Sequence, residues 1–309
     1  MYDILVIGGG PAGLTAALYA ARAGKSCAVL ERATPGGQIV NSPLVENYPG
    51  LPHMSGADFA ARLQEQAEEL GVELLYEDAE RAERQADGSF SVATDAGTHE
   101  ARALILATGV QHRALGLPGE AALVGSGVSY CALCDGAFFA GRDVAVVGGG
   151  DTALQDALFL SGLCRSVTVL VRRDRFRGER KKAEQLRQKQ NVSIRFGRTV
   201  AELWDRNGEL RGLTLNVAGS EEHESLPVEG LFLAVGQEPV GAIFSTLADT
   251  DGEGYFRAGE DTLTATPGVF AAGDARSKTV RQLTTAVADG AVAATKACEW
   301  LDENNDWHL

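Results

Sequence analysis

The chain has 309 residues, 45% of them hydrophobic, and a formal net charge of −14. This length suggests two domains that each bury a core without disulfides or metals, and the acidic charge argues against nucleic-acid or anionic-membrane binding. No apolar run approaches the ~20 residues of a membrane span, and no basic targeting segment opens the chain, so we expect a cytoplasmic protein.

The first predicted elements form a strand, a glycine turn, a helix and a second strand. The apolar residues 4–7 predict the first strand, residues 14–23 the helix, and residues 27–30 the second strand. This order within about 30 residues is typical of a unit that binds a dinucleotide.

The turn itself carries the pattern G-x-G-x-x-G at Gly8, Gly10 and Gly13. In such a turn the first glycine allows the bend, the second lets pyrophosphate approach the backbone, and the third lets the helix pack on the strand. Glu31 ends the second strand, where a carboxylate would accept a hydrogen bond from a ribose hydroxyl. We therefore predict a dinucleotide site at this turn.

A C-x-x-C pair follows at Cys131 and Cys134, while the other three cysteines are scattered. This usage is typical of a reducing compartment with one redox or metal pair. Zinc needs four ligands, and no second C-x-x-C or spaced histidine pair is present, so a redox dithiol is favoured. The adjacent Asp135 is a candidate proton donor if burial raises its pKa; the alternatives are a helix cap, or both roles.

The strand and glycine turn recur with an offset of 140 residues. Between residues 5–32 and 145–172, 11 of 28 positions are identical, and the apolar strand 104–106 with its glycine has a counterpart at 231–236. Two dinucleotide-binding domains are the simplest explanation. The second turn contains Gly148, Gly150, Asp151, Thr152 and Ala153.

The two copies differ in charge where the ribose would lie. Glu31 aligns with Val171, which Arg172 and Arg173 follow, with Arg177 nearby. Guanidinium groups in place of a carboxylate suit a 2′-phosphate. Residues 172–189 hold nine basic and three acidic residues, and from Lys181 onward we expect a solvated helix face.

These motifs together resemble the bacterial-type, low-molecular-weight thioredoxin reductases over nearly the whole chain. Beyond the two fingerprints and the C-x-x-C-D, the resemblance rests on Gly36-Gly37-Gln38, residues 45–50, Ala107-Thr108-Gly109, Gly273-Asp274 and Arg281-Gln282. One departure is Val171, where the family usually has histidine.

The resemblance implies an α/β fold of two Rossmann-like, doubly wound, three-layer domains, the second inserted into the first. We place an FAD domain at residues 1–112 and 241–309 and an NADPH domain with the redox pair at 113–240. It further implies a homodimer, a rotation between the domains, and electron flow from NADPH through FAD and the Cys131–Cys134 disulfide to oxidised thioredoxin. Cys134 would face the flavin, Cys131 would attack the partner, and Asp135 would donate a proton.

The implied cofactor contacts fall into two sets, with no metal ligand. For FAD they are Gly8, Gly10, Pro11, Ala12, Gly13, Glu31, Gly37, Gln38, Asn47, Thr108, Gly109, Gly273, Asp274, Arg281 and Gln282. For NADPH they are Gly148, Gly150, Asp151, Thr152, Ala153, Arg172, Arg173 and Arg177.

Other interpretations remain. A reductase of the same fold could take electrons from ferredoxin or a deazaflavin, or act on another thioredoxin-like protein. A non-enzymatic, redox-sensing nucleotide-binding module is less favoured, because two cofactor sites accompany the redox pair. A reductase with fused thioredoxin-like N-terminal domains is also less favoured, because the FAD fingerprint begins at residue 8.

Overall fold

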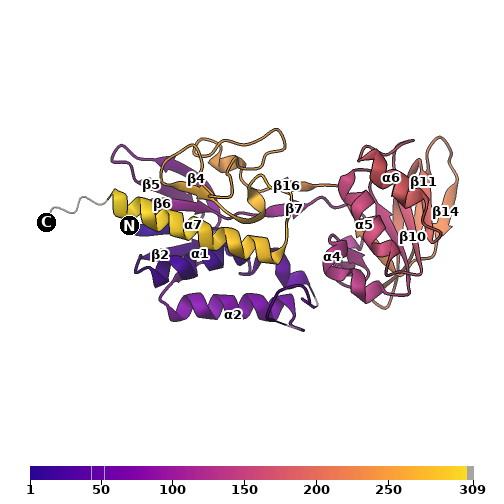
Figure 1. Ribbon diagram of the computed structural model, residues 1–309, viewed down its shortest axis with the longest axis horizontal. Coiled ribbons are helices and arrows are strands. Elements are labelled where there is room, and N and C mark those ends of the chain that lie inside the picture. The colour runs from indigo at the N-terminus through magenta and orange to yellow at the C-terminus, as the bar shows by residue number, and fades with distance from the viewer. Residues whose placement is uncertain (43, 52, 305–309) are drawn as a thin grey trace. The chain divides into compact units, whose positions relative to one another are not determined.

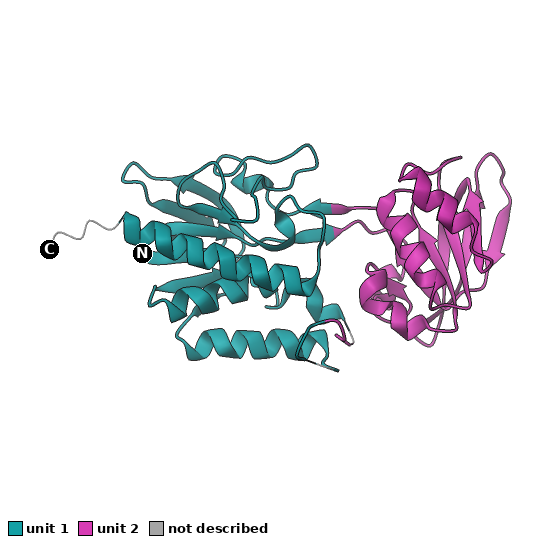
Figure 2. Cartoon of the chain, in the orientation of Figure 1, with its two compact units in different colours: residues 1–43, 48–111, 238–309 teal, residues 44–47, 112–237 magenta. Residues whose placement is uncertain are grey.

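The computed structural model describes residues 1–42, 44–51 and 53–304, so the last five residues of the predicted first domain lie outside it. The chain divides into two compact units (Figure 2). Unit 1 comprises residues 1–43, 48–111 and 238–309, and unit 2 comprises residues 44–47 and 112–237. The long segment of unit 2 is thus inserted between two parts of unit 1.

Unit 1 is built on a seven-stranded sheet (Figure 1). Its elements are β1 (Tyr2–Ile7), α1 (Pro11–Arg22), β2 (Cys27–Leu30), η1 (Gly37–Asn41), α2 (Gly56–Glu69), β3 (Glu73–Leu75), β4 (Ala79–Arg84), β5 (Phe90–Thr94), β6 (Thr98–Leu106), η3 (Ala242–Phe244), β17 (Val269–Ala271), η4 (Gly273–Ala275) and α7 (Leu283–Glu303).

The strand order in unit 1 is β3-β2-β1-β6-β5-β4, and β17 also pairs with β6. Strands β1, β2, β3, β6 and β17 are parallel, whereas β5 pairs antiparallel with both β6 and β4. One face of the sheet packs against α1, α2 and α7. On the other face, apolar residues of the sheet strands, β4 and β5 included, form one cluster with apolar residues of segment 244–258.

Unit 2 contains a five-stranded parallel sheet of order β11-β10-β9-β15-β8 and a three-stranded antiparallel sheet of order β12-β13-β14. Its elements are α3 (Glu120–Leu123), β8 (Val128–Ser129), α4 (Ala132–Asp135), η2 (Gly136–Phe139), β9 (Asp143–Val147), α5 (Asp151–Ser161), β10 (Ser166–Val171), α6 (Arg180–Arg187), β11 (Val192–Phe196), β12 (Arg198–Arg206), β13 (Glu209–Val217), β14 (His223–Leu226) and β15 (Gly230–Leu233).

The parallel sheet of unit 2 has an apolar layer on each face. Helices α5 and α6 cover one face, and the three-stranded sheet covers the other. Each glycine turn follows a central parallel strand, β1 in unit 1 and β9 in unit 2, and leads into a helix, as the sequence predicts. The predicted α/β fold with Rossmann-like parallel sheets is confirmed.

The chain passes between the units within two short paired strands, β7 (Val110–His112) and β16 (Gln237–Pro239). The unit boundaries at 111/112 and 237/238 therefore differ by one and three residues from the predicted ones. The assignment of residues 44–47 to unit 2 was not indicated by the sequence.

Candidate redox and nucleotide-binding sites

The C-x-x-C pair forms a disulfide between Cys131 and Cys134, whose Cα atoms lie 5.3 Å apart. Cys131 is the N-cap of α4, and its Sγ accepts the backbone N–H of Cys134 at 3.2 Å. Both cysteines are half-buried, and Leu133 between them is exposed. A short helical turn thus holds the half-buried disulfide next to an exposed leucine.

Asp135 follows the disulfide directly, and its carboxyl group has one satisfied and one unsatisfied oxygen. Oδ2 accepts the Ser129 hydroxyl at 2.6 Å, while Oδ1 is buried with no hydrogen-bond partner in the described chain. Burial raises the pKa of Asp135, opposed by the bond from Ser129. Its side chain makes no capping bond at η2, so the structure disfavours the helix-cap alternative. A buried, unpaired carboxyl oxygen suits a group that holds a proton.

Ser129 is a site residue that sequence reasoning missed. Its hydroxyl donates to Asp135 and its oxygen accepts the backbone N–H of Cys131 at 3.0 Å, so one side chain orients both groups. The sequence signal is weak, because a serine two residues before a cysteine has no motif of its own.

A second missed feature is a chain of contacts that reaches the residue before Cys131. The Tyr130 ring stacks on His112 at 4.8 Å between centroids, and the Tyr130 hydroxyl donates to the buried Glu120 at 3.2 Å. A Gln237 Nε2 lies 3.3 Å from the His112 Nδ1. Burial lowers the pKa of His112 to about 4, so this ring is neutral near pH 7. The contacts link the redox segment to strands β7 and β16.

At the first glycine turn, neighbouring backbone atoms leave no room for a side chain at two of the glycines. A methyl group at Gly13 would lie 1.8 Å from the Gly8 carbonyl oxygen, and one at Gly8 would lie 2.4 Å from the Ala107 carbonyl oxygen. At Gly10, by contrast, the nearest atom to such a methyl is 4.0 Å away. Two of the glycines are therefore required for packing, while Gly10 faces open space where a pyrophosphate would approach.

Glu31 lies beside this turn. Its Oε2 accepts the Gly9 N–H at 2.8 Å, and its Oε1 accepts the Ala33 N–H at 2.9 Å. Each carboxylate oxygen retains a lone pair, so the same group is able to accept a ribose hydroxyl. The following loop returns to the turn, since Gly36 N–H donates to the Gly9 carbonyl at 2.7 Å and Gly37 packs on Gly10.

Other predicted contacts gather at the same end of the unit 1 sheet. Gly273 lies against Ala12, where an added methyl would be 2.8 Å from the alanine Cβ. Thr108 Oγ1 and Asp274 Oδ1 are buried without a hydrogen-bond partner among the described residues, although Lys278 Nζ lies 3.5 Å from the aspartate oxygen. Buried polar atoms without partners beside an open glycine turn, which we call a nucleotide cradle, fit a bound flavin dinucleotide.

The remaining predicted contacts in this part of the chain have structural partners as well. Gln38 Nε2 donates to the Val110 carbonyl, and Gln282 caps α7 in a capping box with Thr285. The Arg281 guanidinium lies over the Tyr255 ring, 4.1 Å from its centroid. Asn47 is exposed and is grouped with unit 2, so the structure does not gather it with this set.

The second glycine turn has the same construction. A methyl group at Gly148 would lie 2.4 Å from the Ala234 carbonyl oxygen, whereas nothing lies within 4 Å of one at Gly150. The side chain of the buried Val171 closes the turn at Gly149. Unit 2 therefore offers its own open position for a pyrophosphate at the start of α5.

The arginine-rich loop folds back onto this second turn. The Arg177 and Gly178 N–H groups donate to the Gly149 carbonyl at 2.6 and 3.2 Å, and Glu179 N–H donates to Asp151 at 2.8 Å. Arg172, Arg173 and Arg177 are exposed, and no described residue engages their guanidinium groups. Unpaired guanidinium groups beside a phosphate cradle suit an additional phosphate.

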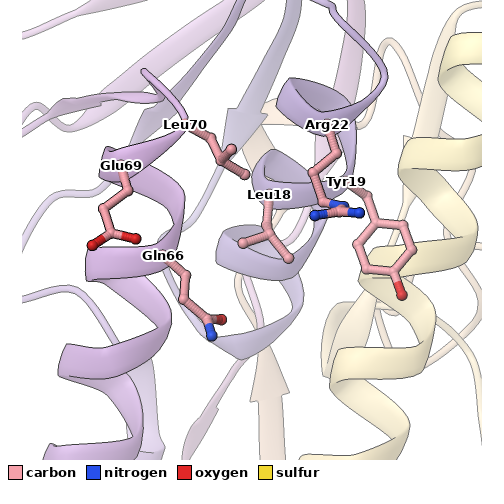
Figure 3. Close-up of a pocket in the computed structure, with 6 residues that line it drawn as sticks. All are labelled: Leu18, Tyr19, Arg22, Gln66, Glu69 and Leu70. Carbon is pink, nitrogen blue, oxygen red and sulfur yellow. The ribbon is translucent and has the colours of Figure 1, made fainter.

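A surface pocket in unit 1 lies away from these residues, between α1 and α2 (Figure 3). It is lined by Leu18, Tyr19, Arg22, Gln66, Glu69 and Leu70. None of them belongs to the predicted sites, and the pocket adds no nucleotide contact.

Two nucleotide cradles in separate α/β units and one accessible cystine define a nucleotide-dependent disulfide oxidoreductase. Comparison with known proteins agrees with this class. Residues 2–290 match the model of the pyridine nucleotide-disulphide oxidoreductase family, and the chain belongs to this family. The chain is accordingly an enzyme, an oxidoreductase.

Its relatives narrow the resemblance to the thioredoxin reductases. The thioredoxin reductase of Listeria monocytogenes is 41% identical over 307 residues, covering 98% of this chain and 95% of the relative. That of Bacillus subtilis is 38% identical over 305 residues, covering 98% and 96%. The structure of the thioredoxin reductase of Streptococcus pyogenes has a TM-score of 0.92 at 39% identity, covering 98% of this chain and 99% of that one. The predicted family resemblance is confirmed.

Proposed function

We propose that this chain reduces the disulfide of a thioredoxin with electrons from NADPH, using bound FAD and its own Cys131–Cys134 pair. The observation that carries the proposal is the cystine beside a buried, half-satisfied carboxyl group, in a chain with two nucleotide cradles of opposite charge. The names of its relatives support thioredoxin as the acceptor.

The two cradles are assigned by their charge. In unit 1 the carboxylate of Glu31 suits the free ribose hydroxyls of FAD, and Thr108 and Asp274 offer further polar atoms to it. In unit 2 Arg172 and Arg173 suit the 2′-phosphate of NADPH. Unit 1 is therefore the FAD domain, and unit 2 is the NADPH domain. When bound, the flavin supplies the two-electron chemistry between the nicotinamide and the cystine.

The chain's own chemistry is thiol–disulfide exchange. In the reduced pair, the Cys131 thiolate attacks one sulfur of the partner disulfide, forms a mixed disulfide and releases a partner thiolate. The Cys134 thiolate then attacks Cys131 Sγ, which restores the Cys131–Cys134 disulfide and releases the second partner thiolate. Two electrons pass to the partner. The assignment of Cys131 as the attacking residue follows the family resemblance.

Asp135 manages protons during this cycle. Its raised pKa keeps the carboxyl group protonated at higher pH than an exposed aspartate, and it follows Cys134 directly in the chain. We assign it as the proton donor to a departing thiolate on the family resemblance. Ser129 orients the carboxyl group through Oδ2 and leaves Oδ1 for the proton.

We also propose a cytoplasmic homodimer on the family resemblance. Cys27, Cys164 and Cys298 are free, buried thiols, as expected in a reducing compartment. Among the described residues, no helix is long and apolar enough to cross a membrane.

The proposal is tested with the Cys131→Ser and Cys134→Ser variants, and with Cys164→Ser as the matched control. The purified wild type should be yellow, and NADPH should bleach its flavin absorbance in all four proteins. Thioredoxin reduction should disappear in the first two variants and persist in the control.

Two outcomes would contradict the proposal. Turnover of thioredoxin by either redox variant would exclude the cysteine assignment. A wild type that binds FAD but is not bleached by NADPH would favour a ferredoxin- or deazaflavin-fed reductase.

A further inference from the structure

A group of buried charged side chains lies next to Asp274, one of the predicted FAD contacts. The side chains of Arg276, Lys278 and Asp289 are only 3%, 5% and 7% exposed. Arg276 and Lys278 follow η4, and Asp289 belongs to α7. We call these three residues the buried ion network. Because removing charged groups from water is costly unless they are paired, the partners of each member decide what the network does.

The carboxylate of Asp289 is fully paired. Its Oδ1 accepts from Arg276 Nη2 at 2.8 Å, and its Oδ2 accepts from Arg276 Nε at 2.8 Å. The same Oδ2 also accepts from the Gly273 N–H at 3.0 Å and from Lys278 Nζ at 2.9 Å. Arg276 thus binds this carboxylate through two hydrogen bonds, the strongest geometry for such a pair, and its other acidic contact is the exposed Glu260. The charge of Asp289 is therefore balanced by Arg276 even without the lysine.

The ammonium group of Lys278 has one N–H bond left after its contacts within the fold. It donates to Asp289 at 2.9 Å and to the Thr285 hydroxyl at 3.3 Å, which uses two of its three donors. The Asp274 Oδ1 lies 3.5 Å from the same nitrogen. Because Asp289 is already shared with an arginine, the pairing of the buried ammonium group is completed by Asp274.

Asp274 lies beside this positive charge and still offers an acceptor. Its Oδ1 is buried and makes no hydrogen bond within the described residues, so its contact with Lys278 is an ion pair only. Burial raises the pKa of Asp274, and the positive charges of Lys278 and Arg281 oppose this rise. A charged carboxylate accepts hydrogen bonds and donates none, which suits a hydroxyl group of a flavin dinucleotide.

We propose that Lys278 is a positioning residue of the FAD site: Asp289 fixes its ammonium group, and the ammonium group holds the Asp274 carboxylate as an acceptor for a hydroxyl of the flavin dinucleotide. The inference rests on the proposed function, which assigns FAD to unit 1. The bond from Gly273 N–H to Asp289 ties the turn that carries Asp274 to α7 as well. Removal of Lys278 should therefore weaken FAD binding through Asp274 alone.

The test measures the Kd for FAD of full-length holoproteins, with free and bound FAD separated by ultrafiltration over a dilution series. Lys278→Met removes the charge at similar length, and Lys278→Gln keeps an amide donor for Asp289. Both variants should fold, because Arg276 and Gly273 still pair with Asp289. Each should raise the Kd for FAD about tenfold, which corresponds to about 1.4 kcal/mol.

Two further variants separate positioning from general stability. Lys25→Met is the matched control, because Lys25 is half-buried, pairs with Asp302 and follows α1 at the end opposite the glycine turn. Its Kd for FAD should match that of the wild type. In an Asp274→Asn background, Lys278→Met should raise the Kd no further, since the carboxylate that the lysine holds is already gone.

Three results would overturn the positioning role and leave the proposed function intact. One is an unchanged Kd for FAD in both Lys278 variants, and another is an equal rise in Lys25→Met. The third is a further tenfold rise from Lys278→Met in the Asp274→Asn background, because the lysine would then act without the aspartate. A full-length wild type that binds no FAD would overturn the proposed function and this inference together.

Discussion

At the residue scale, our proposal assigns the choice of electron donor to Arg172 and Arg173. NADPH differs from NADH by its 2′-phosphate, and a charge-assisted contact contributes roughly 1.5–3 kcal/mol. Since about 1.4 kcal/mol is tenfold in affinity, the Arg172→Ala, Arg173→Ala double variant should raise the KM for NADPH at least tenfold and leave that for NADH almost unchanged. Flavin reduction by each nucleotide at fixed ionic strength measures this.

The matched control for this experiment removes two charges elsewhere in the basic segment. Lys181 and Lys189 are exposed and lie outside the loop that contacts Gly149. A Lys181→Ala, Lys189→Ala variant should keep its preference for NADPH. An equal rise of the KM for NADPH in both double variants would mean that the segment acts through its total charge rather than through a phosphate contact.

In the proposed mechanism, the pH dependence of thiol–disulfide exchange reports the protonation of Asp135. Its pKa is raised in the folded protein, so the proton is present below that pKa and is lost as pH rises through it. The wild-type rate of thioredoxin reduction should fall as pH rises through the pKa of Asp135. The Asp135→Asn variant should be slow at every pH and should show no such fall. Because the Ser129 hydroxyl lowers the pKa, Ser129→Ala should move the fall to higher pH. A Ser129→Ala profile that matches the wild type would remove Asp135 from the proton step.

Sequence reasoning at this scale succeeded where chemistry requires a spaced motif. The glycine turns and the C-x-x-C pair have fixed spacing, and in each turn the structure leaves one glycine open, Gly10 or Gly150, while others are closely packed. Ser129 and the His112–Tyr130 stack were not predicted. Their contacts depend on the tertiary fold, and no sequence motif marks these residues. Whether each predicted residue touches a cofactor stays a prediction.

Among the elements, α5 carries a half-buried acid, Asp156, that no motif singled out. Burial raises the pKa of Asp156 from 3.8 to about 7. A group with a raised folded pKa contributes stability below its unfolded pKa, and that contribution is lost as pH rises through the folded value.

Asp156→Asn should therefore flatten the pH dependence of the free energy of unfolding between about pH 4 and pH 7, where the wild type loses at most about 1.4 kcal/mol per pH unit. Urea denaturation at several pH values measures this. Asp249→Asn, at an exposed position in unit 1, is the control and should leave the slope unchanged. An unaltered slope in the Asp156 variant would show that this carboxyl group is solvated.

The predicted elements match the observed ones where apolar runs are short and flanked by glycine. The strands predicted at 4–7 and 27–30 are β1 and β2, and the predicted helix 14–23 is α1. Helix α1 begins earlier, at Pro11, because proline is favoured in the first helical turn. No element is predicted over the antiparallel strands β12–β14, because the prediction follows the nucleotide-binding and redox motifs and this segment carries none.

At the scale of the whole molecule, unit 2 is nearly a continuous segment whose ends meet. Arg113 N–H donates to the Gly236 carbonyl at 3.1 Å, and His112 lies beside Gln237. Residues 112–237 should therefore fold alone and unfold cooperatively in urea, as followed by circular dichroism.

The fragment 1–111 gives the contrast. It lacks β17, which pairs with β6, and α7, which packs so closely on α1 that a methyl group at Gly290 would lie 2.1 Å from the Ala12 carbonyl oxygen. This fragment should show no cooperative transition. Cooperative unfolding of 1–111, or its absence in 112–237, would contradict the division into units.

The pairing of β6 with β17 also sets an order of events on the ribosome. Residues 104–106 are synthesised about 160 residues, or roughly 10–30 seconds of translation, before residues 269–271. During that interval the inserted unit is completed, while one edge of β6 stays without its neighbour. Unit 1 is begun first and completed last. The nascent chain is therefore most vulnerable to aggregation while the residues after unit 2 are being synthesised.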